Sequence, residues 1–534
     1  MSLSIERLPL AGSPISQTYV NDYPSVDSFY NAGSPTAVES YRRVAEHIRE
    51  HSSAERWNVL VDGLAPDDPK VASRLDQLVK GRGVFVATGQ QAGLFVSPLF
   101  TLYKALTAVR LAEQLQAALG IPVMPLFSTA SEDHDWDEVN HTHVIDLENR
   151  LVRLSAEDAV PAANGRRPSV EKIELGPGIE ATFDQLKEAV PESEFSGSVL
   201  TPLRGAYRSG RGFAEAFELA LGDLLSDYPI LRARTAHRYV KAASAGLMWD
   251  EWQKRRESEE RMLERVGKLS AAGYEAQVSV ASGSTNLFFE GPLGRDRIMQ
   301  EGEGARLRRS GELLSAAELQ EVLQSNPERV SPGALFRPVA EATAFPVVAY
   351  VGGPGEIAYL AQSQVLFDLH GVPAPVVVPR AAFQLVESKI ARVLEKYELP
   401  SADLAGDSSA TINRLLKDRT PPQLKESLAE LRQAASAALD RVEASAIEFD
   451  PGTKSVLGSG KRAMFESIKN LEGKLQSRVK EKNQVMQQQL EKAALHLYPG
   501  GRRQERVLNP YPYLVRYGRA LLQEIYAQVT TPLG

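Results

Sequence analysis

The stretch SEDHDWDEVNH, residues 131–141, holds the densest group of chemically active side chains in the sequence. An imidazole beside carboxylates suits general acid–base chemistry, because a carboxylate fixes the tautomer and supports the charged ring. A solvated acidic loop and a divalent metal site are the alternatives, and the metal is disfavoured because this stretch has no helical His-x-x-x-His spacing. We therefore predict no metal ligands and take as candidate catalytic residues Glu132, Asp133, His134, Asp135 and His141.

A second candidate site is the loop in ATGQQAGLFV, residues 87–96, which lacks both the Walker A spacing and the full dinucleotide fingerprint. The amides of Gln90 and Gln91 donate and accept hydrogen bonds, so they suit a neutral polar ligand better than bare phosphate. Gly89 and Gly93 allow the backbone to turn and approach that ligand. Lys104, two turns into the following helix, either points back to a phosphate or lies on a solvated face.

A third candidate is GGPGE, residues 352–356. Its glycines and the helix that follows could hold a phosphate or carboxylate, although a tight strand-to-helix turn explains them equally well. Arg337 and Arg380 are each able to grip an anion with a bidentate fork, or to serve as ordinary surface or ion-paired arginines.

The elements that must position these residues form two β-α-β patterns. Apolar runs at 83–88 and 121–130 flank a helix that we expect to begin at Pro98, with Ser97 as N-cap, and to end at Gly120. The pattern returns at 344–372 and 373–380. We predict one parallel sheet built from both halves, with ligands at the carboxyl ends of its strands.

The residues between and after these patterns differ in character. The intervening segment carries charged helices, such as 250–269, short strands within 274–299, and a capping box at Ser315 and Glu318. After about residue 381 the apolar residues follow a/d spacing on two segments, which predicts an antiparallel helical hairpin. The seam residues of this hairpin would be Leu424, Leu428, Leu431 and Val442 facing Ile468, Leu471 and Leu475.

Composition limits the classes of function. The 534 residues carry a net charge of −7, so no basic field points to nucleic acid. No apolar run is long enough for a membrane span, and the N-terminus lacks a signal-peptide pattern, so we expect a cytoplasmic protein. The chain has no cysteine, which excludes disulfides and a cysteine nucleophile.

Taken together, these blocks resemble the cysteine ligase family of bacillithiol biosynthesis. The matching stretches are TGQQAGLFVSPLFTLYKALTAVRLAEQL, SEDHDWDEVNH, NPERVSPGALFRPVAEATAFPVVAYVGGPGEIAY, VPAPVVVPR and QERVLNPYPYLVRYG, and they span nearly the whole chain. The resemblance implies an α/β fold with a Rossmann-like parallel-sheet core, inserted connecting segments and a C-terminal coiled-coil arm. The implied divisions are a first core part with a helical N-terminal region (1–150), connecting segments (151–335), a second core part (336–385), the helical arm (386–500) and a segment returning to the core (501–534).

The resemblance also implies a reaction, in which L-cysteine is joined through its carboxyl to the amine of glucosaminyl malate. The implied partners are these two substrates and a second copy of the chain, bound through the arm. ATP or another nucleotide is the expected activating donor, although neither His-x-x-His nor Lys-Met-Ser-Lys-Ser is present. Besides the candidate catalytic residues, the family's blocks map substrate binding onto Gln90, Gln91, Glu138, Asn140, Arg337, Gly353, Gly355, Glu356, Tyr359 and Arg380.

One departure from the family pattern lies near residue 230, where PILRARTAHRYVK places Arg232, Arg234 and His237 in positions usually held by small polar residues. This departure puts substrate contacts at that strand end in doubt. Two other functions fit the same residue types: a non-catalytic sugar-binding or scaffold protein of the pathway, and a metal-dependent hydrolase at residues 131–141.

Overall fold

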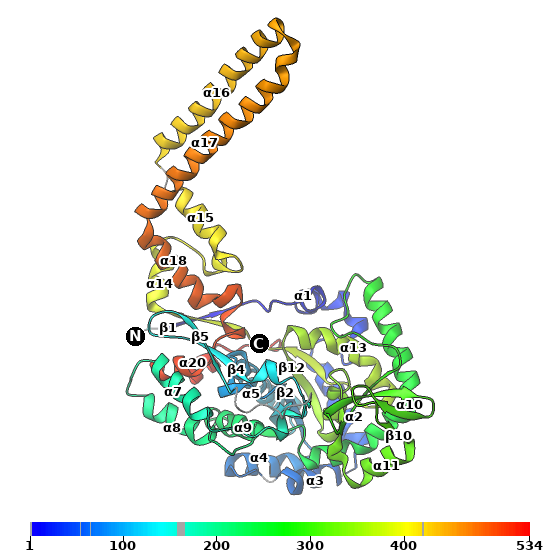
Figure 1. Ribbon diagram of the computed structural model, residues 1–534. Helices are drawn as coiled ribbons and strands as arrows, with labels where there is room; N and C mark the ends of the chain where they lie inside the picture. Colours follow the sequence, from blue (N-terminus) through cyan, green and yellow to red (C-terminus); the bar gives the residue numbers. More distant parts are fainter. Residues whose placement is uncertain (1–2, 54, 65, 157–165, 419–420) are drawn as a thin grey trace. The chain divides into compact units, whose positions relative to one another are not determined.

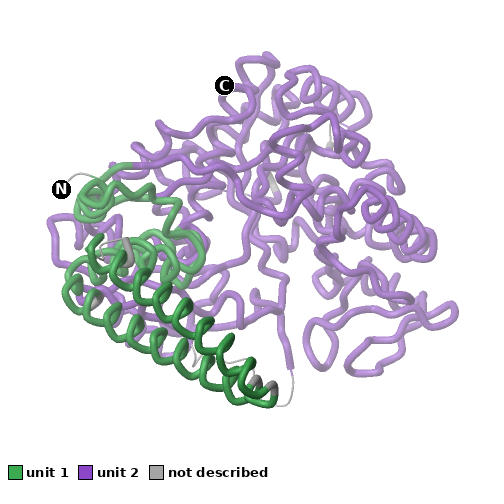
Figure 2. Tube along the Cα trace, turned by 90° about the horizontal axis from the view of Figure 1, so that it is seen from above, with its two compact units in different colours: residues 1–4, 385–504 green, residues 5–384, 505–534 purple. Residues whose placement is uncertain are grey.

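A computed structural model describes residues 3–53, 55–64, 66–156, 166–418 and 421–534. The chain divides into two compact units, one formed by Ile5–Gln384 with Glu505–Gly534 and the other by Met1–Ser4 with Leu385–Gln504 (Figure 2). Within the described ranges, none of the helices combines the length and the apolar character that crossing a membrane would require.

The larger unit is built on a parallel sheet of five strands, in the order β13-β12-β2-β3-β6. Two of its strands, β12 and β2, are labelled in Figure 1. Four of these strands are the apolar runs of the two β-α-β patterns, and their burial on both faces explains why they read as continuously apolar. The predicted Rossmann-like sheet is therefore confirmed. The strands are β2 (Val84–Gln90), β3 (Val123–Thr129), β6 (Leu231–Arg234), β12 (Val347–Gly352) and β13 (Val376–Pro379).

The connecting helices end where the sequence predicts. Helix α5 (Phe100–Leu119) stops at Gly120 and α13 (Pro354–His370) at Gly371, and both glycines adopt left-handed conformations, with φ of 67° and 62°. The predicted start of α5 is wrong, because Leu99 is its N-cap and Ser97 instead closes a preceding 3₁₀ turn. Three further helices pack on the sheet or beside it: α2 (Val38–His51), α3 (Glu55–Leu64) and α4 (Pro69–Lys80).

Two insertions separate the core strands. Between β3 and β6 lie the hairpin β4 (His141–Ile145) and β5 (Leu151–Ser155), followed by helices α7 (Ile179–Ala189), α8 (Ser196–Ala206) and α9 (Phe213–Leu224). The second insertion begins with the 34-residue helix α10 (Arg238–Ala271). It continues into an antiparallel sheet that contains β7 (Ser284–Gly291) and β8 (Gly294–Glu301), then α11 (Ala316–Ser325) and α12 (Arg337–Ala344). The predicted capping box of Ser315 and Glu318 opens α11.

The smaller unit is helical. Helices α14 (Ser388–Lys396), α15 (Ser408–Asp418) and α18 (Gln484–Leu497) enclose a small apolar core, and α16 (Pro422–Phe449) with α17 (Lys454–Lys482) forms the antiparallel hairpin. Cross-helix ion pairs fix the hairpin register, with Arg432 2.9 Å from Glu472 and Lys461 2.7 Å from Asp440.

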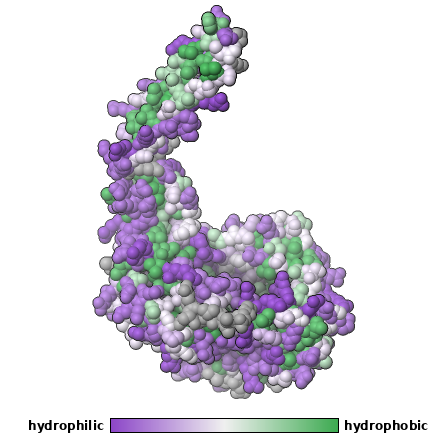
Figure 3. All heavy atoms as spheres, in the orientation of Figure 1, coloured by the Kyte–Doolittle hydropathy of each residue, from purple (hydrophilic) through white to green (hydrophobic). Residues whose placement is uncertain are grey.

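The predicted seam of this hairpin is only partly right. Leu424, Leu428 and Leu475 line the groove between the two helices, whereas three predicted seam residues face solvent, with exposed fractions of 41% for Leu431, 53% for Val442 and 44% for Leu471. Figure 3 shows apolar side chains distributed along the surface of the helical arm. Because a short hairpin can bury only one stripe, its remaining apolar residues stay on the surface.

Candidate active site

A cavity of about 490 Å³ opens at the carboxyl ends of β2 and β12. The chain runs from β2 toward β3 on one side and adds β12 on the other, so this edge is the topological switch point where open parallel sheets bind ligands. The volume is in the range of small-molecule sites. Ten of the residues predicted from the sequence line it: Gln90, Gln91, Asp133, Glu138, Arg337, Gly353, Gly355, Glu356, Tyr359 and Arg380.

The loop that contains Gln90 and Gln91 is held in place by the buried side chain of Lys104. The Lys104 ammonium, 2% exposed, donates to the Gly89 carbonyl at 2.6 Å and to Gln90 Oε1 at 3.2 Å, and it pairs with Glu356 Oε2 at 2.5 Å. Lys104 thus points back toward the loop, and the solvated-face alternative is wrong. Burial lowers its pKa, while the Glu356 carboxylate opposes that shift. The amide of Gln91 donates to Asp133 Oδ2 at 3.2 Å, which ties the loop to the acidic segment.

In the glycine loop at the end of β12, the Glu356 side chain accepts a hydrogen bond from the start of the loop. The Gly353 N–H donates to Glu356 Oε2 at 2.7 Å, and the Tyr350 hydroxyl donates to Glu356 Oε1 at 2.9 Å. These two hydrogen bonds and the ion pair with Lys104 together engage both oxygens of the Glu356 carboxylate. The N–H of the residue that caps the N-terminus of α13 is therefore used within the protein, and Glu356 faces the cavity as a fixed, paired charge.

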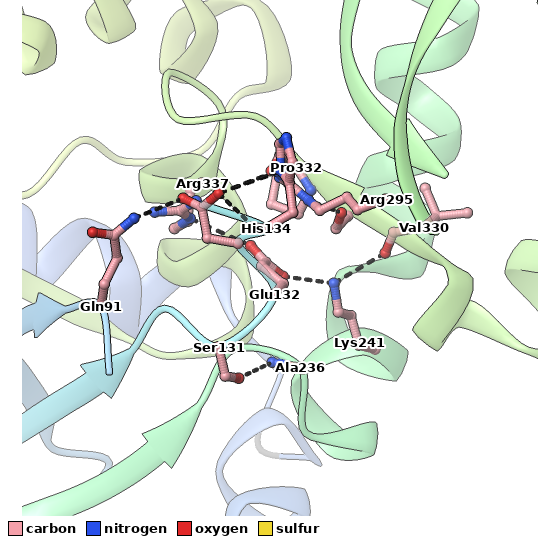
Figure 4. A network of polar contacts seen from close by, with 12 residues as sticks. Gln91, Ser131, Glu132, His134, Ala236, Lys241, Arg295, Val330, Pro332 and Arg337 are labelled. Carbon is pink, nitrogen blue, oxygen red and sulfur yellow. Dashed lines mark hydrogen bonds and ion pairs between the residues drawn. The ribbon is translucent and has the colours of Figure 1, made fainter. Parts of the chain in front are cut away.

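The acidic segment after β3 is held in place by cations from three distant elements (Figure 4). Glu132 is 4% exposed and lies 2.6 Å from the Lys241 ammonium and 3.3 Å from Arg337 Nε. Burial alone would raise the pKa of Glu132, but Lys241, Arg337 and Arg295 together hold it below its ordinary value.

Asp133 is the neighbouring carboxylate in this network. It accepts from Arg337 Nη2 at 3.3 Å and lies 3.6 Å from Arg295 Nη1. Burial opposes ionisation here too, but the two guanidiniums hold the pKa of Asp133 well below its usual range. Asp133 and Arg337 both line the cavity, so this network forms one charged wall of the site.

His134 lies beside this wall and contacts β8, with its Nδ1 3.5 Å from Asp133 Oδ1. Its Nδ1 accepts from Arg295 Nη1 at 3.1 Å, and its ring lies beside Phe288. Burial and the Arg295 charge lower the pKa of His134 to about 4, so near neutral pH the ring is uncharged and carries its proton on Nε2. Protonating Nδ1 would break the Arg295 bond. His134 is outside the cavity lining, and its catalytic role stays a prediction.

The candidate catalytic residues Asp135 and His141 and the predicted substrate-binding residue Asn140 lie outside the cavity. Asp135 is largely exposed, and its pKa is raised by partial loss of solvent and by the negative charges of Asp133 and Asp137. The Asn140 side chain is buried against His141, with Asn140 Oδ1 3.0 Å from His141 Nδ1. The structure brings none of these three to the cavity lining, nor Glu132.

The departure near residue 230 also lies outside the lining. Arg234 at the end of β6 pairs with Glu171 at 2.5 Å and with Glu218 at 3.0 Å, and His237 caps the N-terminus of α10. Arg234 therefore serves local ion pairing, and His237 serves helix capping.

Arg380 is engaged more tightly than the sequence suggests. Its Nη1 and Nη2 donate to the two oxygens of Glu505, at 2.9 and 2.7 Å, and both side chains are almost fully buried. The bidentate hydrogen bonding that we expected Arg380 to offer a ligand is therefore made to Glu505. Because Glu505 belongs to the C-terminal segment, this pair also fastens that segment to the end of β13 and places Arg506 in the cavity wall.

Sequence reasoning missed several residues of the site. Glu341, Tyr350, Phe100 and Arg506 line the cavity, and Lys241 and Arg295 hold its acidic wall. Glu341 had one available signal, since it stands one helical turn after Arg337 and so shares its face of α12. No sequence signal identified Lys241 or Arg295, because the residues they contact, Glu132 and His134, are more than 100 residues away.

Across the parts of the chain that the structure describes, no three or more His, Asp or Glu side chains are grouped so as to hold a metal ion. The fold and the cavity define a Rossmann-like protein. Its ligand site lies at the switch point of the sheet, is polar, and contains both positively and negatively charged side chains. Residues 2–381 match the family described as bacillithiol biosynthesis BshC, N-terminal Rossmann-like domain, and residues 383–533 match the coiled-coil domain of the same family. The chain belongs to the BshC family.

Individual relatives cover almost the entire chain. One from Salinibacter ruber is 32% identical over 95% of this chain and 92% of its own length. Others are 29% identical, from Chlorobaculum tepidum (84% and 82% covered), and 26% identical, from Desulforamulus reducens (96% and 95%). All three carry the provisional name cysteine ligase BshC.

Proposed function

We propose that this protein joins the carboxyl of L-cysteine to the amine of glucosaminyl malate, forming an amide. The observation that carries the proposal is the cavity at the switch point, which combines fixed cations, fixed carboxylates and neutral amides. Glucosaminyl malate offers carboxylates, hydroxyls and an amine, and each has a complementary group in this wall. The names of the relatives support a cysteine ligase.

Activation of the cysteine carboxyl requires a donor, and we propose ATP or another nucleotide. The guanidinium groups of Arg337 and Arg506 line the cavity and suit the charge of a phosphate group. In this arrangement the protein orients the two substrates and stabilises the charge on the leaving group.

The test is direct incubation of the purified protein with glucosaminyl malate, cysteine and a nucleotide, with thiol product followed by mass spectrometry. We expect product only when all three are present. Binding of glucosaminyl malate without product under every nucleotide tried would instead indicate a sugar-binding protein of the pathway.

Replacing Gln91 with alanine is expected to weaken the binding of glucosaminyl malate about tenfold, because a buried polar contact is typically worth about 1–2 kcal/mol. The melting temperature should change little, since Asp133 keeps its two guanidinium partners. Isothermal titration calorimetry measures the first quantity and differential scanning calorimetry the second. Gln320→Ala, at an exposed position of α11, is the matched control. A large fall in melting temperature with unchanged affinity would make Gln91 a structural loop residue.

We further propose that the protein is a homodimer joined partly through the helical arm. The exposed stripe containing Leu431, Val442 and Leu471 gives each hairpin an apolar face for a second copy. We expect Leu431→Glu with Leu471→Glu to convert a dimer to a monomer in sedimentation velocity at micromolar concentration. The control is a double variant, Glu430→Gln with Lys474→Gln, at two exposed positions, and it should stay dimeric. A monomeric wild-type protein would refute this arrangement.

A further inference from the structure

The carboxylates of the cavity differ in how fully their oxygens are engaged. Asp133 is held by Arg337 and Arg295, and both oxygens of Glu356 accept hydrogen bonds or an ion pair. Glu138 is exposed and interacts with the Gln91 amide. These three carboxylates therefore serve as fixed charges or as surface groups.

Glu341 is different from the other three. It is 7% exposed and lines the cavity, and its Oε1 accepts no hydrogen bond from any residue that the structure describes. A buried carboxyl oxygen without a partner is costly, so its presence at a ligand cavity indicates that a ligand supplies the missing donor.

The surroundings of Glu341 keep it available for a proton. Burial raises the pKa of Glu341 to about 8, against the opposing effects of a hydrogen bond from Ser128 and the positive charge of Arg337. Two further carboxylates, Glu356 and Glu132, add to the upward shift. The hydroxyls of Tyr350 and Tyr359 are the other titratable groups that face it, and both have pKa values raised far above their ordinary value, mainly by burial. Both hydroxyls therefore stay neutral in the pH range in which Glu341 titrates.

We propose that Glu341 binds the ammonium group of the amine substrate and takes its proton as the amide bond forms; this rests on the proposed ligase function. Its position on α12 is one turn beyond Arg337, so one helix face presents a fixed cation for an acidic group and a proton acceptor for an amine.

The step balances as follows. The ammonium of the sugar carries three N–H protons, and Glu341 accepts one, which frees the nitrogen lone pair. The nitrogen attacks the acyl carbon of the activated cysteine, a C–N bond forms, and the C–O bond to the phosphate-containing leaving group breaks. The second proton is lost to water from the adduct, and the third remains as the amide N–H. Glu341 then returns its proton to solvent.

Binding alone provides the first test. Near pH 7 Glu341 is mostly protonated, and an arriving ammonium lowers its pKa, so glucosaminyl malate should displace close to one proton, about 0.9. Calorimetric titration in two buffers of different ionisation enthalpy measures this proton release. We expect the release to disappear in Glu341→Gln and to persist in the control Glu321→Gln, an exposed position on α11. The N-acetylated sugar, which has no ammonium, should release none from the wild-type protein.

Turnover provides the second test. We expect kcat of Glu341→Gln to fall about 100-fold. The wild-type kcat/KM, which reports the free protein, should rise near pH 8, and this rise should be abolished in the variant. Glu341→Asp should restore the pH dependence at a reduced rate. Equal proton release in wild type and Glu341→Gln, or an unchanged pH–rate profile in that variant, would overturn the proposal. If no protein forms product but proton release still depends on Glu341, the amine site stands and the ligase function fails.

Discussion

Replacing Arg337 with glutamine is expected to lower kcat/KM for product formation about 1000-fold, because an anionic group of the bound substrate or nucleotide would lose its charged partner in the cavity, which costs about 2–5 kcal/mol. Arg337 is the cation that both lines the cavity and bonds to the acidic wall, through Glu132 at 3.3 Å and Asp133 at 3.3 Å. Steady-state kinetics with the nucleotide saturating and each substrate varied in turn gives the measurement.

The fold should survive this substitution. Glu132 keeps Lys241, and Asp133 keeps Arg295 and the His134 backbone N–H, so neither carboxylate is left unpaired. Arg337→Lys retains the charge but not the planar fork, and an intermediate rate is expected. Arg306→Gln, at an exposed ion pair on β9 (Gly304–Leu307), serves as the control and should be indistinguishable from wild type. Wild-type kinetics in Arg337→Gln would remove Arg337 from the site.

The core of the fold was predictable because its signals are local. The strands 83–88 and 373–380 are short and continuously apolar, and the glycines at 120 and 371 mark helix ends that require a left-handed residue. The arm was predictable as a hairpin but not in its packing. Heptad spacing identifies an apolar stripe, whereas the register that decides which leucines are covered comes from pairs such as Arg432 with Glu472, across 40 residues.

The candidate site was predictable in its location more than in its chemistry. Polar residues after apolar strands identified the cavity wall at Gln90, Asp133 and Gly353. Which groups are free and which are engaged depends on long-range partners. Arg380 reads as a ligand-binding arginine until Glu505, 125 residues later, occupies its fork. Glu341 reads as an ordinary helix residue until the sheet and α13 bury it.

Replacing Lys241 with methionine is expected to lower the free energy of unfolding by about 3–5 kcal/mol, because it leaves the Glu132 carboxylate buried without its nearest cation. The pair is 2.6 Å apart with side chains 3% and 4% exposed, and the Lys241 ammonium also donates to the Val330 carbonyl at 3.0 Å. It thus joins α10 to the acidic wall of the cavity. Equilibrium unfolding in urea, followed by circular dichroism, measures the change.

Two further variants and a pH series make this result interpretable. Glu132→Gln added to Lys241→Met should recover part of the loss, since a neutral amide is cheaper to bury than a carboxylate that has lost its nearest cation. Lys268→Met, in an exposed pair with Glu264 on the same helix, should have almost no effect. Because the pKa of Glu132 is lowered in the folded state, the wild-type advantage over the double variant should be present above the ordinary carboxyl pKa and should diminish as the pH falls through the lowered value. Equal stability of Lys241→Met and Lys268→Met would show that the pair contributes nothing to the fold.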